Sequence, residues 1–127
     1  MKVKEMMNKA VAIEHNITLK EAAKIMSSRN IGCLVIIRNG KVVGIVTERD
    51  IMRNISNLNE KISSIMARKV ITISPDDDID DAALLMTKHK IRRLPVVDSE
   101  SGELVGIITS TDLIAHSEDI SEEFFFD

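Results

Sequence analysis

The chain has 127 residues, of which 44% are hydrophobic and 29% charged, and its formal net charge at pH 7 is −3. This composition excludes a disordered chain, and the length fits one domain or two small ones with a shared core. The acidic balance disfavours a nucleic-acid binder, and no run approaches the roughly 20 apolar residues of a membrane span. The start also lacks the apolar region of a signal peptide, so we expect a cytoplasmic protein.

The core is predicted to be aliphatic, because the chain has no Trp or Tyr and its three Phe residues lie among the last four positions. Cys33 is the single cysteine, stands in an apolar run and is predicted to be a buried thiol in a reducing compartment. The acidic tail, residues 121–127, carries Phe124, Phe125 and Phe126. It has two interpretations: a frayed terminus, or a segment that docks on this molecule or on a partner chain.

The first elements in chain order are a short strand and an amphipathic helix. Residues 10–13 form the first apolar run. Thr18 and Glu21 resemble a capping box, which indicates that a helix begins there. The apolar positions that follow have the spacing of one buried helical face, and they are Leu19, Ala22, Ala23 and Met26.

Two further strands and a closing helix complete the first half. Residues 31–37 and 41–47 are rich in β-branched residues, and Asn39-Gly40 between them is a strong hairpin signal. Residues 48–55 begin the closing helix. Each half is therefore predicted to run strand, helix, strand, strand, helix.

The second half repeats the first. Corresponding apolar residues lie 60 positions apart, with Met6 opposite Met66 and Ala22 opposite Ala82. After an insertion around residues 99–103 the spacing becomes 62. Residues 70–73 then match the first strand, and Pro95, in the run 94–98, is expected at a sheet edge or a strand start. So many coincidences at nearly constant spacing indicate an internal repeat.

The predicted domains are residues 1–60 and 61–120, followed by the tail. A half of about 60 residues buries a low fraction of its surface and is marginal alone. We therefore expect an α/β fold of two βαββα-like repeats, packed sheet to sheet with pseudo-two-fold symmetry and forming two equivalent clefts.

Each half contains one copy of a short phrase, GIVTERDI at residues 44–51 and GIITSTDL at residues 106–113. Both keep a Thr where a strand gives way to a helix, and an Asp three residues later. One interpretation is a helix cap, with the Asp meeting the helix dipole. The other is a nucleotide site, because a helix N-terminus and a Thr hydroxyl suit phosphate, and an ionised Asp accepts from ribose hydroxyls. Ile45 and Ile107 would then pack against the flat face of a purine. Capping and nucleotide binding are compatible.

Over residues 3–117 the chain resembles the CBS-domain pair family, named for the regulatory part of cystathionine β-synthase. The resemblance rests on the openings VKEMMNKAVAI and ISSIMARKVITI, the strands IGCLVII and RRLPVVD, and the two GIxTxxDh phrases. It implies tandem CBS domains that bind AMP, ADP, ATP or S-adenosylmethionine, with the Asp at the ribose and the Thr nearer the phosphate.

The resemblance also implies that the phrase of one repeat faces a strand start of the other. Thr47 and Asp50 would face residues 91–93, and Thr109 and Asp112 would face residues 31 and 32. The expected ligand-binding residues are Ile45, Thr47, Arg49, Asp50, Ile91, Arg92, Arg93, Ile31, Gly32, Ile107, Thr109, Thr111 and Asp112.

The two strand starts differ in charge, since KHKIRR at residues 88–93 corresponds to SRNIGC at residues 28–33. Guanidinium groups match phosphate geometry. The hypothesis is therefore that the Asp50 site, with Arg92 and Arg93 nearby, binds phosphate better than the Asp112 site, which faces Gly32 and Cys33.

Other signals have simpler interpretations. KHKIRR lacks the nearby aromatic residues of a nucleic-acid patch, which favours a solvated helix end with ligand contacts. Asp76, Asp77 and Asp78 precede a helix and are predicted to cap it rather than to bind a cation. The histidines (His15, His89 and His116) lack metal-ligand spacing, and no catalytic motif is present, so we expect no enzyme and no metal.

The function expected from the sequence is a stand-alone sensing module that binds an adenosine ligand, requires no cofactor, forms a homodimer and signals to a separate effector protein. The alternative is a protein-interaction scaffold with unoccupied sites, in which the Thr and Asp are only helix caps. A nucleic-acid-binding regulator ranks third. Composition does not distinguish AMP from ATP or S-adenosylmethionine.

Overall fold

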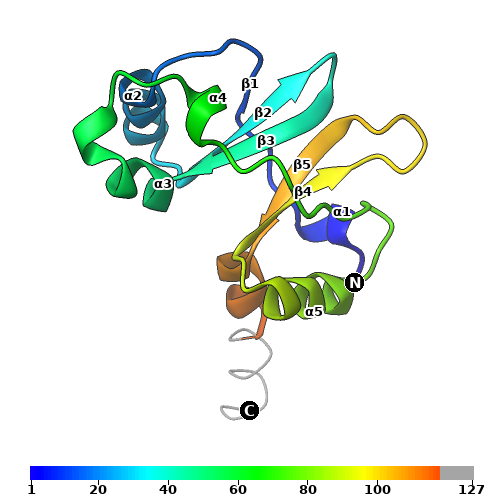
Figure 1. Cartoon of the computed structure of the whole chain (residues 1–127). Helices are drawn as coiled ribbons and strands as arrows, with labels where there is room; N and C mark the ends of the chain where they lie inside the picture. Colours follow the sequence, from blue (N-terminus) through cyan, green and yellow to red (C-terminus); the bar gives the residue numbers. More distant parts are fainter. Residues whose placement is uncertain (118–127) are drawn as a thin grey trace. The chain divides into compact units, whose positions relative to one another are not determined.

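A computed structural model describes residues 1–117 and shows an α/β protein of two compact units (Figure 1). The N-terminal unit comprises residues 10–70, and the C-terminal unit combines residues 1–9 with the chain from residue 71 onward. The compact units therefore do not follow the repeat boundary between residues 60 and 61, because the opening segment of each repeat joins the other unit. The tail at residues 121–127 lies outside the described residues.

The N-terminal unit holds the predicted elements in the predicted order. Its elements are β1 (Ala12–Ile13), α2 (Leu19–Arg29), β2 (Cys33–Arg38), β3 (Lys41–Thr47), α3 (Glu48–Arg53), the 3-10 helix η1 (Ile55–Asn57) and α4 (Ile62–Ile65). The sheet order is β1-β2-β3, with β1 parallel and β3 antiparallel to β2. The hairpin turn is confirmed, because Asn39 and Gly40 both have positive φ, 53° and 80°.

The C-terminal unit has a smaller sheet. Its elements are α1 (Val3–Met6), α5 (Ile79–His89), β4 (Arg93–Val97) and β5 (Leu104–Thr109), and residues 110–117 are helical. β4 and β5 pair antiparallel. Figure 1 shows α5 beside this hairpin, with α1 next to it.

The strand predicted at residues 70–73 is wrong, since only Ile73 forms a single parallel bridge, to Val96. The physical reason is Pro95. In the other unit the N–H of Val35 donates to the carbonyl of Val11 at 3.1 Å. Pro95 stands at the equivalent position and has no N–H to donate. Pro95 itself lies inside β4. The edge of β4 that does not pair with β5 has only one bridge among the described residues, from Ile73 to Val96.

Each unit has its own aliphatic core, as predicted. In the N-terminal unit the fully buried residues include Leu19 and Leu34, and in the C-terminal unit they include Leu94 and Ile108. No polar or charged side chain within residues 1–117 is buried. Also within this part of the chain, no helix combines the length and the apolar character that crossing a membrane requires.

Two helices begin at the capping residues that the sequence predicts. Thr18 accepts a hydrogen bond from the N–H of Glu21 at 3.1 Å at the start of α2. Asp78 accepts from the N–H of Asp80 at 2.9 Å at the start of α5. Capping by Thr18 and by Asp78 is therefore confirmed.

The openings of the two repeats correspond with a shift of one residue. Val3 and Ile62 are the buried residues of α1 and α4, with exposed fractions of 0% and 1%. Met7 packs against Gly106 as Met66 packs against Gly44. The predicted pairing of Met6 with Met66 is therefore wrong by one residue, because contact with the glycine, rather than sequence spacing, fixes the register.

Candidate ligand-binding site

Thr47 and Asp50 form a complete capping box where β3 ends and α3 begins. The N–H of Thr47 donates to Asp50 Oδ2 at 2.9 Å, and Thr47 Oγ1 accepts from the N–H of Asp50 at 3.4 Å. The Thr47 hydroxyl also donates to the same carboxylate oxygen at 3.2 Å. The capping interpretation of this phrase is therefore confirmed, and it fixes the orientation of the Asp50 carboxylate.

Thr109 and Asp112 have the same arrangement between β5 and the helical residues 110–117. The N–H and the hydroxyl of Thr109 both donate to Asp112 Oδ2 at 2.9 Å. The N–H of Asp112 donates back to the Thr109 hydroxyl at 3.3 Å. The two phrases thus present one half-exposed carboxylate each, in the same local geometry.

The surroundings of the two carboxylates differ. Asn8 Nδ2 donates to both oxygens of Asp112, at 3.1 Å each. Asn8 is placed by two backbone hydrogen bonds with Ile107, of 2.8 and 2.9 Å. In the other unit Ala67 makes the matching backbone bonds with Ile45, of 3.0 and 3.1 Å. Ala67 offers no polar side chain to Asp50.

Asn8 is a residue that sequence reasoning missed. The repeat spacing of 60 places Asn8 opposite Arg68, whereas the backbone pairing places it opposite Ala67. The signal that could have found Asn8 is the pair of glycines, Gly44 and Gly106. Aligning the methionines that pack on them gives the correct register.

The strand starts lie beside the phrase of their own unit. The N–H of Glu48 donates to the carbonyl of Gly32 at 3.0 Å, and the N–H of Ser110 donates to the carbonyl of Arg92 at 2.8 Å. Arg93 is paired with Thr109 across the β4–β5 ladder. We expected each phrase to face the strand start of the other repeat. That arrangement concerns contacts between the two units, and it stays a prediction.

Arg92 and Arg93 have uncommitted guanidinium groups. Neither side chain makes a hydrogen bond or an ion pair within residues 1–117. Arg92 is exposed and Arg93 is half-buried. Within the C-terminal unit, the backbone contacts of Arg92 with Ser110 and of Arg93 with Thr109 therefore bring two cationic residues to the start of the helical segment. Guanidinium groups favour an anion nearby.

The remaining predicted residues have mixed positions. Ile31 and Ile91 pack at the margins of the two cores. Ile45 and Ile107 belong to neither core cluster and lie on the opposite strand face from Val46 and Ile108, since successive side chains alternate. Arg49 and Thr111 are exposed. Contact of Ile45 and Ile107 with the purine ring of a ligand stays a prediction.

The family model of the CBS domain matches residues 3–57 and 62–119. The chain belongs to the CBS domain family. CBS domain-containing protein YhcV of Bacillus subtilis is 35% identical over 116 residues, which cover 87% of this chain and 81% of the relative. Other curated relatives are longer, and the chain spans only 34%, 22% and 19% of the length of three of them. Some of these longer relatives are enzymes, such as an L-aspartate semialdehyde sulfurtransferase of Methanocaldococcus jannaschii.

Solved structures support the same assignment. The CBS domain pair of protein MJ0100, in complex with 5′-methylthioadenosine and S-adenosyl-L-methionine, has a TM-score of 0.87 and 37% identity. The match covers 94% of this chain and 97% of that one. CBS domain protein PAE2072 from Pyrobaculum aerophilum, complexed with AMP, has a TM-score of 0.83 and 28% identity, over 89% and 90% of the two chains. The α/β fold of a tandem CBS pair is therefore confirmed.

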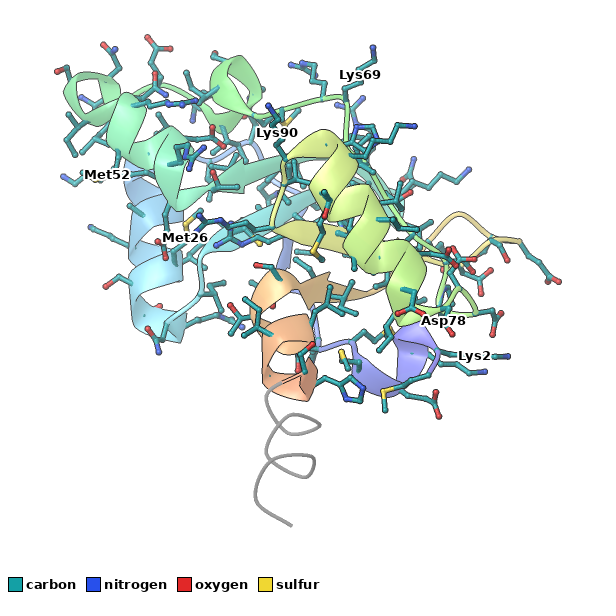
Figure 2. The ribbon with its side chains drawn as sticks, turned by 90° about the horizontal axis from the view of Figure 1, so that it is seen from below. Lys2, Met26, Met52, Lys69, Asp78 and Lys90 are labelled. Atoms are coloured by element: carbon teal, nitrogen blue, oxygen red, sulfur yellow. The ribbon has the colours of Figure 1, made fainter. Side chains whose placement is uncertain are left out.

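The N-terminal unit of this CBS pair also has a pocket between α2 and α3, of about 390 Å³. Figure 2 shows Met26 and Met52 on these neighbouring helices. The pocket is lined by Ala23, Met26, Ser27, Asn30, Ile31, Glu48, Ile51 and Met52. Neither Thr47 nor Asp50 lines it, but the predicted ligand-binding residue Ile31 does, as do Glu48 and Ile51 of the phrase.

The three aspartates before α5 have structural roles in the CBS pair. Asp78 caps α5, and the N–H of Asp80 lowers the pKa of the Asp78 carboxyl below its ordinary value. Asp77 Oδ2 accepts from the N–H of Ser74 at 3.1 Å, and Asp76 pairs with Lys4 at 3.3 Å. Figure 2 shows Lys2 beside the start of α5 at Asp78, where the backbones of the two residues form a bridge.

The part of the chain that the structure describes contains no cluster of three or more His, Cys, Asp or Glu side chains suited to a metal ion.

Proposed function

We propose that this CBS pair is a regulatory module that binds an adenosine-containing ligand at its Thr-x-x-Asp phrases. The observation that carries the proposal is the repeated placement of one half-exposed, oriented carboxylate beside a helix start in each unit. An ionised carboxylate accepts hydrogen bonds from the two hydroxyls of a ribose. The solved relatives complexed with S-adenosyl-L-methionine, 5′-methylthioadenosine or AMP support this ligand class.

The chemistry of the neighbouring groups is consistent with the proposal. Phosphate or another anionic group is favoured near Arg92 and Arg93, whose guanidinium groups are uncommitted within residues 1–117. Ile45 is half-buried and offers apolar surface for a purine, whereas Ile107 is only 8% exposed. The ligand is one of AMP, ADP, ATP, S-adenosylmethionine or 5′-methylthioadenosine.

The proposed role is regulatory rather than catalytic. Ligand binding acts on an effector protein only if the ligand binds one conformation or assembly more tightly than another. A homodimer in the cytoplasm is part of the proposal, and exposed apolar side chains support it. Met52 on α3 and Ile114 in the helical residues 110–117 are 69% and 56% exposed.

A protein-interaction scaffold is the second candidate function. The observation that favours it is that the capping boxes of Thr47 and Thr109 are complete without a ligand. In a scaffold these residues would serve only the helix starts.

Thermal unfolding with a ligand panel separates the two candidates. A ligand that binds only the folded chain stabilises it by RT ln(1 + [L]/Kd), which is about 2.7 kcal/mol at a concentration of 100 Kd. A sensor therefore shows a saturable rise in Tm with at least one adenosine ligand and none with guanosine or cytidine. A scaffold shows the same Tm with every member of the panel.

A further inference from the structure

We infer that Asn8 makes the two ribose-accepting carboxylates unequal, so that Asp50 binds a ribose diol more tightly than Asp112 does. The inference rests on the proposed function and assigns a specificity-determining role to a residue outside both phrases. Asn8 acts through its side-chain amide, which occupies Asp112 and has no counterpart at Asp50.

The two carboxylates differ in unused hydrogen-bonding capacity. An ionised carboxylate has about four lone-pair sites. Asp112 Oδ2 accepts two hydrogen bonds from Thr109, and the single Asn8 Nδ2 lies 3.1 Å from both carboxylate oxygens, so neither oxygen of Asp112 lacks a donor. Asp50 accepts two hydrogen bonds from Thr47, both at Oδ2. Within residues 1–117, Asp50 Oδ1 therefore has no donor, and both of its lone pairs are open to a diol.

Asn8 is held in place by its backbone rather than by its side chain alone. Its N–H and carbonyl both pair with Ile107, at 2.8 and 2.9 Å, next to the phrase that contains Asp112. A ribose that donates to Asp112 must share the carboxylate with the Asn8 amide or displace it. Displacement leaves an exposed amide in water and loses one charge-assisted interaction, so the cost is moderate.

Ala67 is the natural matched control. It makes the same backbone pairing with Ile45 that Asn8 makes with Ile107, and a methyl group replaces the amide side chain. Exchanging the two side chains, by Asn8→Ala and Ala67→Asn, should therefore exchange the properties of the two carboxylates. The chain therefore offers one position at which to remove the amide, Asn8, and one at which to add it, Ala67.

The test measures each site separately by calorimetric titration with S-adenosylmethionine, 5′-methylthioadenosine and AMP. Asp50→Ala leaves only the Asp112 site, and Asp112→Ala leaves only the Asp50 site. Asn8→Ala in the first background should tighten binding about three- to tenfold, and Ala67→Asn in the second should weaken it by a similar factor. The 2′,3′-dideoxy analogue of adenosine has no diol, so its binding should not respond to either change.

The outcomes separate this inference from the proposed function. Unchanged affinity in both exchanged variants, or a loss of affinity with Asn8→Ala, overturns the role of Asn8 while leaving ligand binding intact. Absence of binding of any probe by the unaltered chain overturns the proposed function, and the role of Asn8 with it. Asp50→Asn and Asp112→Asn replace the alanine variants if loss of a cap unfolds the protein.

Discussion

Met7 packs directly against Gly106: a β-carbon added to Gly106 would lie 2.7 Å from Met7 Sδ. The same position would be 2.9 Å from the carbonyl oxygen of Asn8. In the N-terminal unit the three atoms nearest to a β-carbon on Gly44 all belong to the side chain of Met66, with Sδ at 2.5 Å. Each glycine therefore leaves room for a methionine side chain, but only at Gly106 would a backbone atom lie within 3.0 Å of the added β-carbon.

Gly106→Ala should consequently destabilise the protein more than Gly44→Ala. Met66 has rotatable bonds and can move, whereas the Asn8 carbonyl is held by the N–H of Ile107. We expect a loss of about 1–3 kcal/mol for Gly106→Ala, typical of overpacking, and a smaller loss for Gly44→Ala. Denaturant unfolding measures both values. Equal losses would show that the backbone contact has no effect.

Thr47 allows the cap and the ligand to be separated. Thr47→Ala removes the hydroxyl that accepts from the N–H of Asp50, and should cost about 1 kcal/mol in the free energy of unfolding without ligand. Thr47→Ser keeps the hydroxyl and should cost less. The measurement is thermal unfolding of both variants with and without S-adenosylmethionine.

The ligand arm of the Thr47 experiment distinguishes the two possible roles of Thr47, capping alone and capping with ligand contact. If the hydroxyl also contacts the ligand, Thr47→Ala reduces the ligand-induced rise in Tm, and Thr47→Ser restores it. An unchanged rise in Thr47→Ala would limit Thr47 to capping.

The pH dependence of stability should contain a contribution from Asp98. The N–H groups of Ser101 and Glu100 lower the pKa of Asp98 from its ordinary value of 3.8. Because the folded pKa lies below the unfolded value, the stabilisation is present above 3.8 and is lost as the pH falls through the folded pKa. Asp98→Ala should therefore lower Tm at pH 7, and the difference from the unaltered chain should shrink below pH 3.8.

Ser99→Ala is the control for Asp98, since Ser99 is an exposed neighbour whose side chain makes no hydrogen bond within residues 1–117. Its Tm should follow that of the unaltered chain at every pH. A difference between Asp98→Ala and the unaltered chain that stays constant down to pH 2 would contradict the assigned role of the carboxylate.

Local patterns predicted much of this fold. The capping signal at Thr18, the hairpin at Asn39-Gly40 and the repeated phrases all correspond to elements found in the structure. These signals depend on residues within a few positions of one another, so the sequence alone contains the relevant interactions. The aliphatic core followed from composition for a similar reason, because no aromatic residue precedes position 124.

Contacts between distant segments could not be predicted in the same way. Asn8 and Asp112 are 104 residues apart, and their contact depends on the opening segment joining the C-terminal unit. The strand predicted at residues 70–73 failed because of Pro95 in a neighbouring strand, which periodicity within the run does not reveal. The one-residue shift between Met7 and Met66 likewise depends on which side chain meets a glycine in three dimensions.

Titration calorimetry with the Asp50→Ala/Asp112→Ala double variant tests most directly whether the two phrases bind an adenosine ligand. S-adenosylmethionine, 5′-methylthioadenosine, AMP, ADP and ATP are titrated into the unaltered chain and into this variant, with folding of both verified by circular dichroism. We expect saturable binding of at least one of these ligands to the unaltered chain, and an affinity at least about tenfold lower in the variant, which corresponds to about 1.4 kcal/mol. Equal affinity in the two proteins, or no binding of any ligand to the unaltered chain, would contradict it.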